Sequence, residues 1–297
     1  MTVRIRSALD TLPAYAPGRS VPGAIKLASN ELSFPTLPAV AQAIADAAVH
    51  ESAGINRYPD NGAAALVAAL SAHSGAPESH LIAGCGSVAL CQQLVLATAE
   101  RGDEVVFGWR SFEAYPIVTQ ITGATAVRVP VTAGHELDLD AIAAAITPAT
   151  RLVFVCTPNN PTGTTIRRAE WESFLDRVPD DVLVTIDEAY TEFDDAPDSP
   201  DGVAYATARP NVVALRTLSK AYGLAGLRVG YAIADPAVVG AMRKVSSGQG
   251  LTLTVPVSNP GAWTPVGSAV IWDESKAKDM FDAVARGDTS DLEKYAK

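Results

Sequence analysis

The distribution of apolar residues predicts an alternation of strands and helices through most of the chain. Unbroken aliphatic runs such as "RLVFVCT" and "DVLVTI" are typical of strands that are covered on both faces. Longer segments separate these runs, and Gly75 and Gly123 end two of the expected helices. This alternation predicts an α/β fold with an open, mostly parallel sheet and helices on both faces.

The expected elements fill the middle of the chain and leave two different ends. Strands are expected at 80–84, 103–109, 124–131, 151–157, 181–190, 211–220 and 227–234. Helices are expected at 39–50, 63–75, 87–100, 111–123, 139–146 and 168–178. Residues 1–30 are interpreted as an N-terminal arm, 31–245 as one large domain, and 246–297 as a tail of different composition with one amphipathic helix. Ligands of such a sheet bind at the carboxyl ends of its strands.

Charge and cysteine content indicate which binding partners and which cellular compartment to expect. The formal charge of −10 argues against nucleic acid and anionic membrane as main partners. The three cysteines, Cys85, Cys91 and Cys156, lack metal or redox spacing, so we expect buried, reduced thiols. No stretch of the sequence is apolar enough to be expected to cross a membrane, and the first residues lack a signal-peptide pattern. We therefore expect a cytoplasmic protein.

A glycine-rich turn follows the first expected strand. In "AGCGSVAL", Gly86 precedes Ser87, which opens a helix. Exposed N–H groups at a helix N-terminus favour phosphate. The spacing also fits a loose dinucleotide pattern, but the acidic residue which that pattern needs after the next strand is missing. A plain strand–helix turn without a ligand is the alternative.

Two further motifs follow buried strands. "DEAY" begins with Asp187, and a carboxylate at a buried strand end is costly unless a cation or a donor meets it. A protonated ring nitrogen would serve, whereas a solvated loop acid is the alternative, and widely spread histidines disfavour a metal. "CTPNNPTG" holds Asn159 and Asn160 in a rigid loop, which favours oriented side-chain donors over a generic turn.

The segment "TLSKAYGLAGLRVG" places a lysine, two hydroxyls and an arginine at a strand end. A lysine desolvated by apolar neighbours has a lowered pKa and becomes nucleophilic, although a solvated surface lysine is the alternative. Hydroxyls and a guanidinium suit a phosphate dianion. Two phosphate-binding pieces, an acid for a pyridinium and an amine for an imine are together what pyridoxal phosphate needs.

The motifs "NPTG", "DEAY" and "SKAYGLAGLRVGY", in this order, resemble those of the fold-type-I aminotransferases. More narrowly, "KLASNE", "NRYPDNG", "GCGSVALCQQL" and "FGWRSFEAYP" resemble the histidinol-phosphate aminotransferase family and its aromatic (phenylalanine) branch. The resemblance runs from about Lys26 to Val245. It implies a pyridoxal-phosphate enzyme that exchanges an amino group between an aromatic amino acid, or histidinol phosphate, and 2-oxoglutarate.

The resemblance also implies a role for individual residues. Lys220 would form the covalent imine with the cofactor and then shuttle the proton, and Asp187 would keep the pyridine nitrogen protonated. Asn160 and Tyr190 would hydrogen-bond the phenolic oxygen of the ring, and Phe112 would lie on the ring face. The phosphate would be held by Gly86, Ser87, Thr217, Ser219 and Arg228. Tyr58 would reach the phosphate of the neighbouring subunit, which implies a homodimer.

The tail departs from the family. Relatives continue into a small C-terminal domain with an arginine that clamps the substrate carboxylate, whereas Ser246 to Lys297 contains one arginine, Arg286, in a context that does not match. Part of the tail instead resembles the end of a LytR-CpsA-Psr cell-wall ligase domain. We therefore expect a truncated or replaced small domain, or a divergent tail that packs on the sheet. Three functions remain open: an active aminotransferase, a cofactor-binding protein with impaired catalysis, and another fold-type-I enzyme such as a decarboxylase or lyase.

Overall fold

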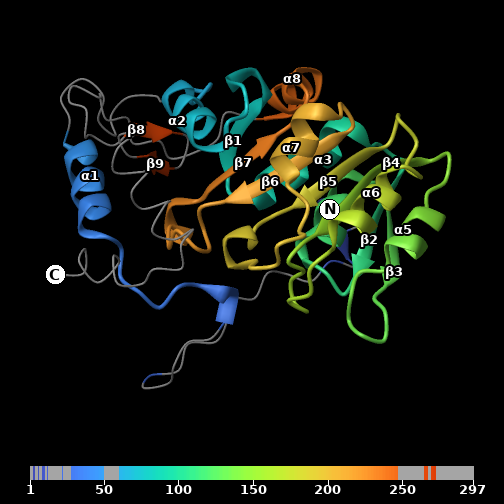
Figure 1. The fold of residues 1–297 in the computed structure, drawn as a ribbon. Coiled ribbons are helices and arrows are strands. Elements are labelled where there is room, and N and C mark those ends of the chain that lie inside the picture. The colour runs from blue at the N-terminus through green and yellow to red at the C-terminus, as the bar shows by residue number, and fades with distance from the viewer. Residues whose placement is uncertain are drawn as a thin grey trace.

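A seven-stranded sheet organises the part of the chain that the computed structural model describes, which is residues 3, 6, 9, 10, 12, 22, 28–49, 60–246, 264–266 and 269–271. In spatial order the strands are β1-β7-β6-β5-β4-β2-β3, which Figure 1 shows from one edge of the sheet to the other. The bounds of these strands are β1 Leu81–Cys85, β2 Glu104–Trp109, β3 Thr125–Pro130, β4 Thr150–Cys156, β5 Leu183–Asp187, β6 Val212–Thr217 and β7 Val229–Ile233.

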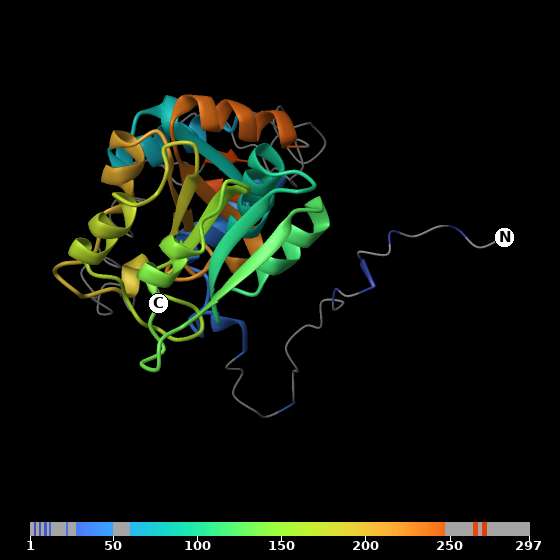
Figure 2. The ribbon, with the colours of Figure 1, turned by 90° about the vertical axis from the view of Figure 1, so that its right-hand side faces the viewer.

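Helices cover both faces of the sheet, as Figure 2 shows. Their bounds are α1 Pro38–Ala48, α2 Ala64–Ser74, α3 Ser87–Thr98, α4 Ala114–Thr122, α5 Leu139–Ala144, α6 Arg168–Leu175, α7 Gly202–Ala208 and α8 Pro236–Val245. Short 3-10 turns lie at Ala28–Asn30, Glu78–His80, Thr191–Phe193 and Ala225–Leu227. The small pair β8 (Thr264–Val266) and β9 (Ala269–Ile271) is antiparallel and separate from the main sheet.

Each face of the sheet has its own apolar core. Residues of α3, α4 and α8, such as Leu94, Tyr115 and Met242, pack on one face. Residues of α2, α5 and α6, such as Leu70 and Trp171, pack on the other. Covering both faces explains why the strands read as unbroken apolar runs. The predicted α/β fold with helices on both faces is confirmed.

Strand β7 is the exception to the parallel arrangement. It pairs antiparallel with both β1 and β6, while the other neighbouring pairs of the main sheet are parallel. The first residues of β7 therefore lie at the edge where the parallel strands end. Gly230 faces Gly84 on one side and Thr217 on the other. A Cβ on Gly230 would lie 2.4 Å from the backbone nitrogen of Ser87, so this glycine allows the turn before α3 to pack against β7.

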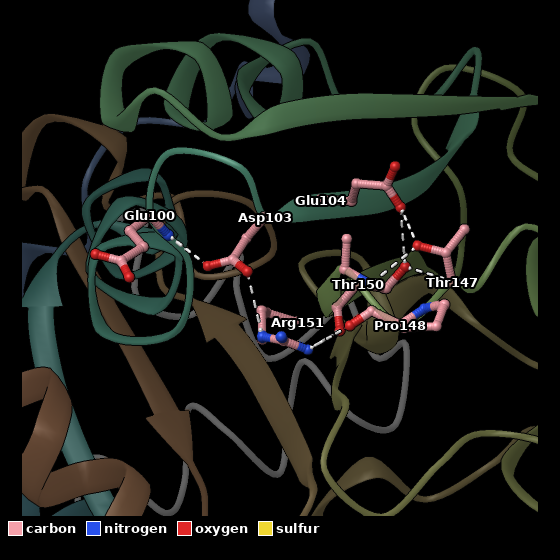
Figure 3. Close-up of polar contacts among 8 residues, drawn as sticks. Glu100, Asp103, Glu104, Thr147, Pro148, Thr150 and Arg151 are labelled. Carbon is pink, nitrogen blue, oxygen red and sulfur yellow. Dashed lines mark hydrogen bonds and ion pairs between the residues drawn. The ribbon is translucent and has the colours of Figure 1, made fainter.

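Polar side chains connect β2 to β4 at the amino ends of these strands, opposite the carboxyl ends, as Figure 3 shows. Glu104 accepts a hydrogen bond from the Thr147 hydroxyl at 2.6 Å, and Asp103 pairs with Arg151 at 3.3 Å. Arg151 also donates to the carbonyl of Pro148. These contacts hold the starts of two parallel strands in register, far from the edge where ligand binding is expected.

Several expected boundaries were wrong by a few residues. The expected helix 111–123 begins at Ala114, because the hydroxyl of Ser111 is bonded to Asn159 before the helix starts. The expected strand 181–190 ends at Asp187, where the chain turns. The helices α7 and α8 were not predicted individually. The helix expected in the tail, and most of residues 246–297, lie outside the described residues.

Candidate active site

A cavity lies at the carboxyl edge of the parallel strands, with about 480 Å³ of empty space that is partly open to solvent. We call it the edge cavity. It brings together residues that belong to, or follow, five of the seven strands, namely β1, β2, β4, β5 and β6. Its lining residues are Ser87, Val88, Phe112, Cys156, Asn160, Asp187, Ala189, Tyr190, Thr217, Ser219, Lys220 and Arg228.

Most of the predicted site residues line this cavity. Gly86 is absent from the lining but directly precedes Ser87 and Val88, which are part of it. Tyr58 lies outside the described residues, so its predicted role stays a prediction.

Asp187 ends β5 with its side chain 1% exposed. One carboxylate oxygen accepts the hydroxyl of Tyr115 at 2.7 Å, and the other accepts the backbone N–H of Ala189 at 3.1 Å. Burial raises the pKa of Asp187 to about 6, although both hydrogen bonds oppose the rise. None of the lysines and arginines that the structure describes forms an ion pair with Asp187. A buried carboxylate in this setting is suited to a cationic ligand.

Lys220 is half-buried just beyond β6. Its Nζ donates to the carbonyl of Ser29 at 2.8 Å and lies 5.6 Å from the centre of the Tyr190 ring. Burial lowers the pKa of Lys220; nearby Glu31 opposes this change and Arg228 adds to it. The amine is therefore easier to deprotonate than a surface lysine, which is the property that a nucleophilic amine needs.

The segment before α1 contacts Lys220 and Tyr190. Ser29 and Asn30 adopt left-handed backbone angles, with φ of 72° and 50°. The amide of Asn30 donates to the hydroxyl of Tyr190 at 2.9 Å. Non-glycine residues in this conformation are uncommon, and here both contact a predicted catalytic side chain.

The other end of the cavity is suited to an anion. Helix α3 begins at Ser87, and its first turn has no side-chain cap. Its N–H groups therefore add partial positive charge beside Arg228. Gly86 has a φ of 81°, and a Cβ there would lie 2.3 Å from Nη2 of Arg228. Only glycine lets the guanidinium approach this turn so closely.

The predicted hydroxyls are used differently from one another. Thr217 donates to the carbonyl of Val229 at 3.1 Å and accepts the N–H of Ser219, so it organises the turn that carries Lys220. The hydroxyl of Ser219 accepts Nη1 of Arg228 at 3.4 Å. Ser87 lines the cavity directly. For Thr217 to bind an anion, its hydroxyl would have to leave the Val229 carbonyl.

The two asparagines of the proline-bounded loop have separate roles, which the sequence did not distinguish. Asn160 lines the cavity. Asn159 is 2% exposed and turned into the protein, where it accepts the hydroxyl of Ser111 at 2.7 Å and donates to the Arg110 carbonyl and the Thr162 hydroxyl. Asn159 therefore ties this loop to the segment that carries Phe112. Both asparagines were expected to be oriented donors at the sheet edge; Asn159 does donate, but to groups of the protein rather than into the cavity.

Sequence reasoning also missed Tyr115 and Arg216. Tyr115 follows Phe112 by three residues, and its N–H donates to the Phe112 carbonyl at 3.1 Å, so one turn before α4 carries both side chains. Arg216 does not line the edge cavity; it pairs with Glu188 at 2.9 Å, and Glu188 also accepts the N–H of Gly202. The two acids of "DEAY" thus have different roles: Asp187 lines the cavity, and Glu188 forms a structural ion pair with Arg216.

Other predictions about chemistry can be compared with the described residues. None of the three cysteines forms a disulfide; Cys91 and Cys156 are buried as expected, whereas Cys85 is half-buried. Within the described ranges no cluster of histidine, cysteine and acidic side chains is arranged to hold a metal ion. No helix in this part of the protein has the length and apolar character needed to span a membrane.

Comparison with known proteins identifies the relatives of this chain. The sequence profile of the family described as aminotransferase class I and II matches residues 22–263. The chain is 62% identical to the aromatic amino acid aminotransferase of Rhodococcus jostii over 245 residues, which cover 82% of this chain and 67% of that protein. It is 56% identical to the protein of the same name from Streptomyces avermitilis over 247 residues, or 82% and 68% of the two chains.

Solved structures give the same picture of the fold. The histidinol-phosphate aminotransferase of Sinorhizobium meliloti, in complex with pyridoxal-5'-phosphate, superimposes with a TM-score of 0.70 at 26% identity over 90% of this chain. The match covers 65% of that protein. Aspartate aminotransferase from Thermus thermophilus, solved with maleate, has a TM-score of 0.68 at 22% identity over 87% of this chain and 65% of its own. The chain thus spans about two thirds of the length of these relatives.

Proposed function

The chain belongs to the class I and II aminotransferases, and from this membership we propose that it transfers the amino group of an aromatic amino acid to 2-oxoglutarate. The observation that carries the proposal is the identity of 54–62% to proteins named aromatic amino acid aminotransferase. The edge cavity supports it independently, because its two ends have the charges that the cofactor of this family needs.

Pyridoxal phosphate fits the residues of the edge cavity. Asp187 offers a buried carboxylate for the ring nitrogen, and Ser87, Ser219 and Arg228 surround the N-terminus of α3, where a phosphate is favoured. Phe112 would lie against the ring, and Asn160 and Tyr190 would bond its phenolic oxygen. When bound, the cofactor supplies an aldehyde for a primary amine and a pyridinium ring that accepts electrons.

Lys220 would hold the cofactor covalently and move the proton. Its lowered pKa makes the neutral amine easier to reach than that of a surface lysine. Nζ would then accept the proton that leaves the α-carbon of the amino acid and later donate a proton, so the amine would act first as a general base and then as a general acid. For this to happen, Nζ has to leave the Ser29 carbonyl, which it contacts at 2.8 Å.

The test is a direct assay of amino transfer. The purified full-length chain, loaded with pyridoxal phosphate, should convert phenylalanine and 2-oxoglutarate into phenylpyruvate and glutamate. Lys220→Ala should abolish both the turnover and the near-ultraviolet absorbance change on cofactor addition. Lys244→Ala, on α8 away from the cavity, is the matched control and should leave both intact. If the wild-type chain turns over none of the aromatic amino acids, the proposal fails.

A cofactor-binding protein with impaired turnover is the second candidate. The observation that favours it is the tail, since the matched segment covers 82% of this chain and the tail has one arginine, Arg286, outside the described residues. A carboxylate clamp orients the substrate for deprotonation, and its loss lowers turnover more than cofactor affinity. This candidate predicts a normal absorbance change that depends on Lys220, without release of glutamate. Histidinol phosphate as donor, or a decarboxylase or lyase reaction, would be found by product analysis in the same assay.

We also propose a cytoplasmic homodimer with the domain organisation expected from the sequence: an arm to residue 30, a large domain at 31–245 and a tail at 246–297. In this dimer Tyr58 of one subunit reaches the phosphate bound by the other. The resemblance of "NRYPDNG" to the family motif is the support for that role.

A further inference from the structure

Tyr115 donates to Asp187, the acid that lines the edge cavity, but is not itself part of the cavity lining. Its ring is 0% exposed and stacks on Phe154 with centroids 4.5 Å apart and an interplanar angle of 5°. A second ring, Phe112, meets it edge-on at 5.6 Å. Fixed by two aromatic neighbours, the hydroxyl of Tyr115 donates to Oδ2 of Asp187 at 2.7 Å.

A carboxylate buried to this degree is stable only where donors replace water. Asp187 has two donors among the described residues, Tyr115 and the backbone N–H of Ala189, and each bonds a different oxygen. Each carboxylate oxygen accepts more than one hydrogen bond, so Asp187 keeps acceptor capacity for a third partner. Because the Ala189 donor belongs to the backbone, Tyr115 is the part of this arrangement that a side-chain substitution can remove.

We propose that Tyr115 is the positioning residue of Asp187: its hydroxyl fixes the orientation of the carboxylate and keeps it ionised for a cationic ring. The inference rests on the proposed function, in which the ring belongs to pyridoxal phosphate. It adds that the turn 112–115 serves both sides of the cofactor. Phe112 covers the face of the ring, and Tyr115 sets the acid at its edge.

Several titratable groups face Asp187 and could mimic such an effect in a pH titration. They are Cys91 on α3, Cys156 at the end of β4, Glu188 and Tyr190 on the same loop, and Lys220 and Arg228 across the cavity. A variant that changes Tyr115 alone leaves all of them in place. The comparison between variants therefore isolates the contribution of this one hydroxyl.

The experiment follows the carboxyl carbon of Asp187 by ¹³C NMR in the cofactor-free full-length chain, with the signal assigned through Asp187→Asn. Tyr115→Phe removes one oxygen and keeps the stacking on Phe154. Since a hydrogen bond to a charged group is worth more than one between neutral groups, we expect the pKa of Asp187 to rise by about one to two pH units. Tyr231→Phe, which removes another buried phenol of the same sheet outside the cavity, should leave it unchanged.

A second variant keeps the test decisive if Tyr115→Phe does not fold. Incorporation of 3-fluorotyrosine at position 115 alone makes the phenol a stronger donor, so the pKa of Asp187 should fall. In parallel, Tyr115→Phe should weaken pyridoxal-phosphate binding at pH 6.5 by roughly tenfold, measured by fluorescence titration, because a larger share of Asp187 is then protonated.

The outcomes separate this inference from the proposed function. An unchanged pKa of Asp187 in the variants at position 115, or an equal change in Tyr231→Phe, would overturn it. A shifted pKa with unaltered cofactor affinity would also overturn it, because the hydroxyl would then serve only the fold. If the wild-type chain fails to transaminate but the pKa shift and the loss of affinity occur, the inference stands and the proposed reaction does not.

Discussion

Two features require glycine at position 86: its left-handed backbone conformation and the close approach of the Arg228 side chain. Its φ is 81°, and a Cβ would lie 2.3 Å from Nη2 of Arg228. The arginine is the flexible partner, so Gly86→Ala should displace the guanidinium from the α3 N-terminus rather than unfold the protein. We expect pyridoxal-phosphate affinity to fall at least about tenfold, since a charge-assisted contact is lost.

Gly75→Ala is the matched control for this substitution. Gly75 has a φ of 76°, but an added Cβ would meet no atom within 4 Å, and the residue caps α2 away from the cavity. It should cost about 1 kcal/mol of unfolding free energy with unchanged cofactor affinity. Urea unfolding and fluorescence titration of both variants measure the two effects. Equal affinities in the two variants would contradict the role given to Gly86.

Asp187 should lower the stability of the cofactor-free chain at neutral pH. The folded-state pKa of about 6 lies above the ordinary value of 3.8 for an aspartate, so the folded state binds more protons than the unfolded state between these pH values. Stability from this group is present at low pH and is lost as the pH rises through 6. Relative to wild type, Asp187→Asn should gain about 2 kcal/mol of unfolding free energy between pH 4.5 and pH 7.

Urea unfolding at both pH values gives this difference, and the other titrating groups cancel in the comparison. Asp180→Asn, at an exposed position, is the control for the removal of one carboxylate. A constant difference between Asp187→Asn and wild type would show that Asp187 titrates alike in both states.

At the scale of elements, the strands and helices were predictable because both faces of the sheet are covered. Unbroken runs such as "RLVFVCT" have no other common setting in a chain of this composition. The direction of β7 was not predictable, because an apolar run carries no sign of its orientation. That direction matters, since it brings Arg228 from the start of β7 to the edge where Asp187 ends β5.

The site was predictable where a residue lies at or just beyond the end of a strand, as Asp187 and Lys220 do. It was not predictable where the function depends on a side chain's orientation. Asn159 and Asn160 are neighbours in one loop, yet only Asn160 lines the cavity. Tyr115 reads in the sequence as one more core aromatic, and its role depends on a hydroxyl that meets a residue 72 positions away.

The ion pair between Arg216 and Glu188 joins three elements, because Glu188 also accepts the N–H at the start of α7. Glu188 is 2% exposed, so Arg216→Met would leave its charge buried without this cation. We expect a loss of about 3–5 kcal/mol in unfolding free energy. The double variant Arg216→Met with Glu188→Gln should recover most of it, since the amide oxygen still accepts from Gly202. Urea unfolding of the set is the measurement, and equal stability of the single and double variants would contradict it.

At the scale of the whole molecule, the edge cavity differs in charge from the acidic chain around it. The net charge is −10, yet Lys220, Arg228 and the N-terminus of α3 meet in the edge cavity. At the amino ends of β2 and β4, two acids are instead bonded within the protein: Asp103 pairs with Arg151, and Glu104 accepts the hydroxyl of Thr147 (Figure 3). The sheet thus separates a ligand-binding edge from a purely structural one, which is the arrangement expected of an open parallel sheet.

The proposed dimer predicts that two inactive chains can restore one another. Lys220→Ala removes the amine of one site, and Tyr58→Phe removes the hydroxyl that would reach the partner's phosphate. A hybrid of the two variants has one site with both residues intact and one site with neither. In a symmetric dimer that is unfolded and refolded as an equal mixture, about half of the molecules are hybrids, so roughly a quarter of the sites are restored.

Glutamate formation at a limiting pyridoxal-phosphate concentration is the measurement, because the loss of Tyr58 is then felt as weak cofactor binding. Mixing Lys220→Ala with Asp187→Asn is the control. Both of these residues line one cavity of one chain, so each hybrid site still lacks one of them and no activity should return. If the Tyr58 mixture shows only the summed activity of its parents, Tyr58 acts within its own subunit or not at all, and a monomer in sedimentation would exclude the shared site.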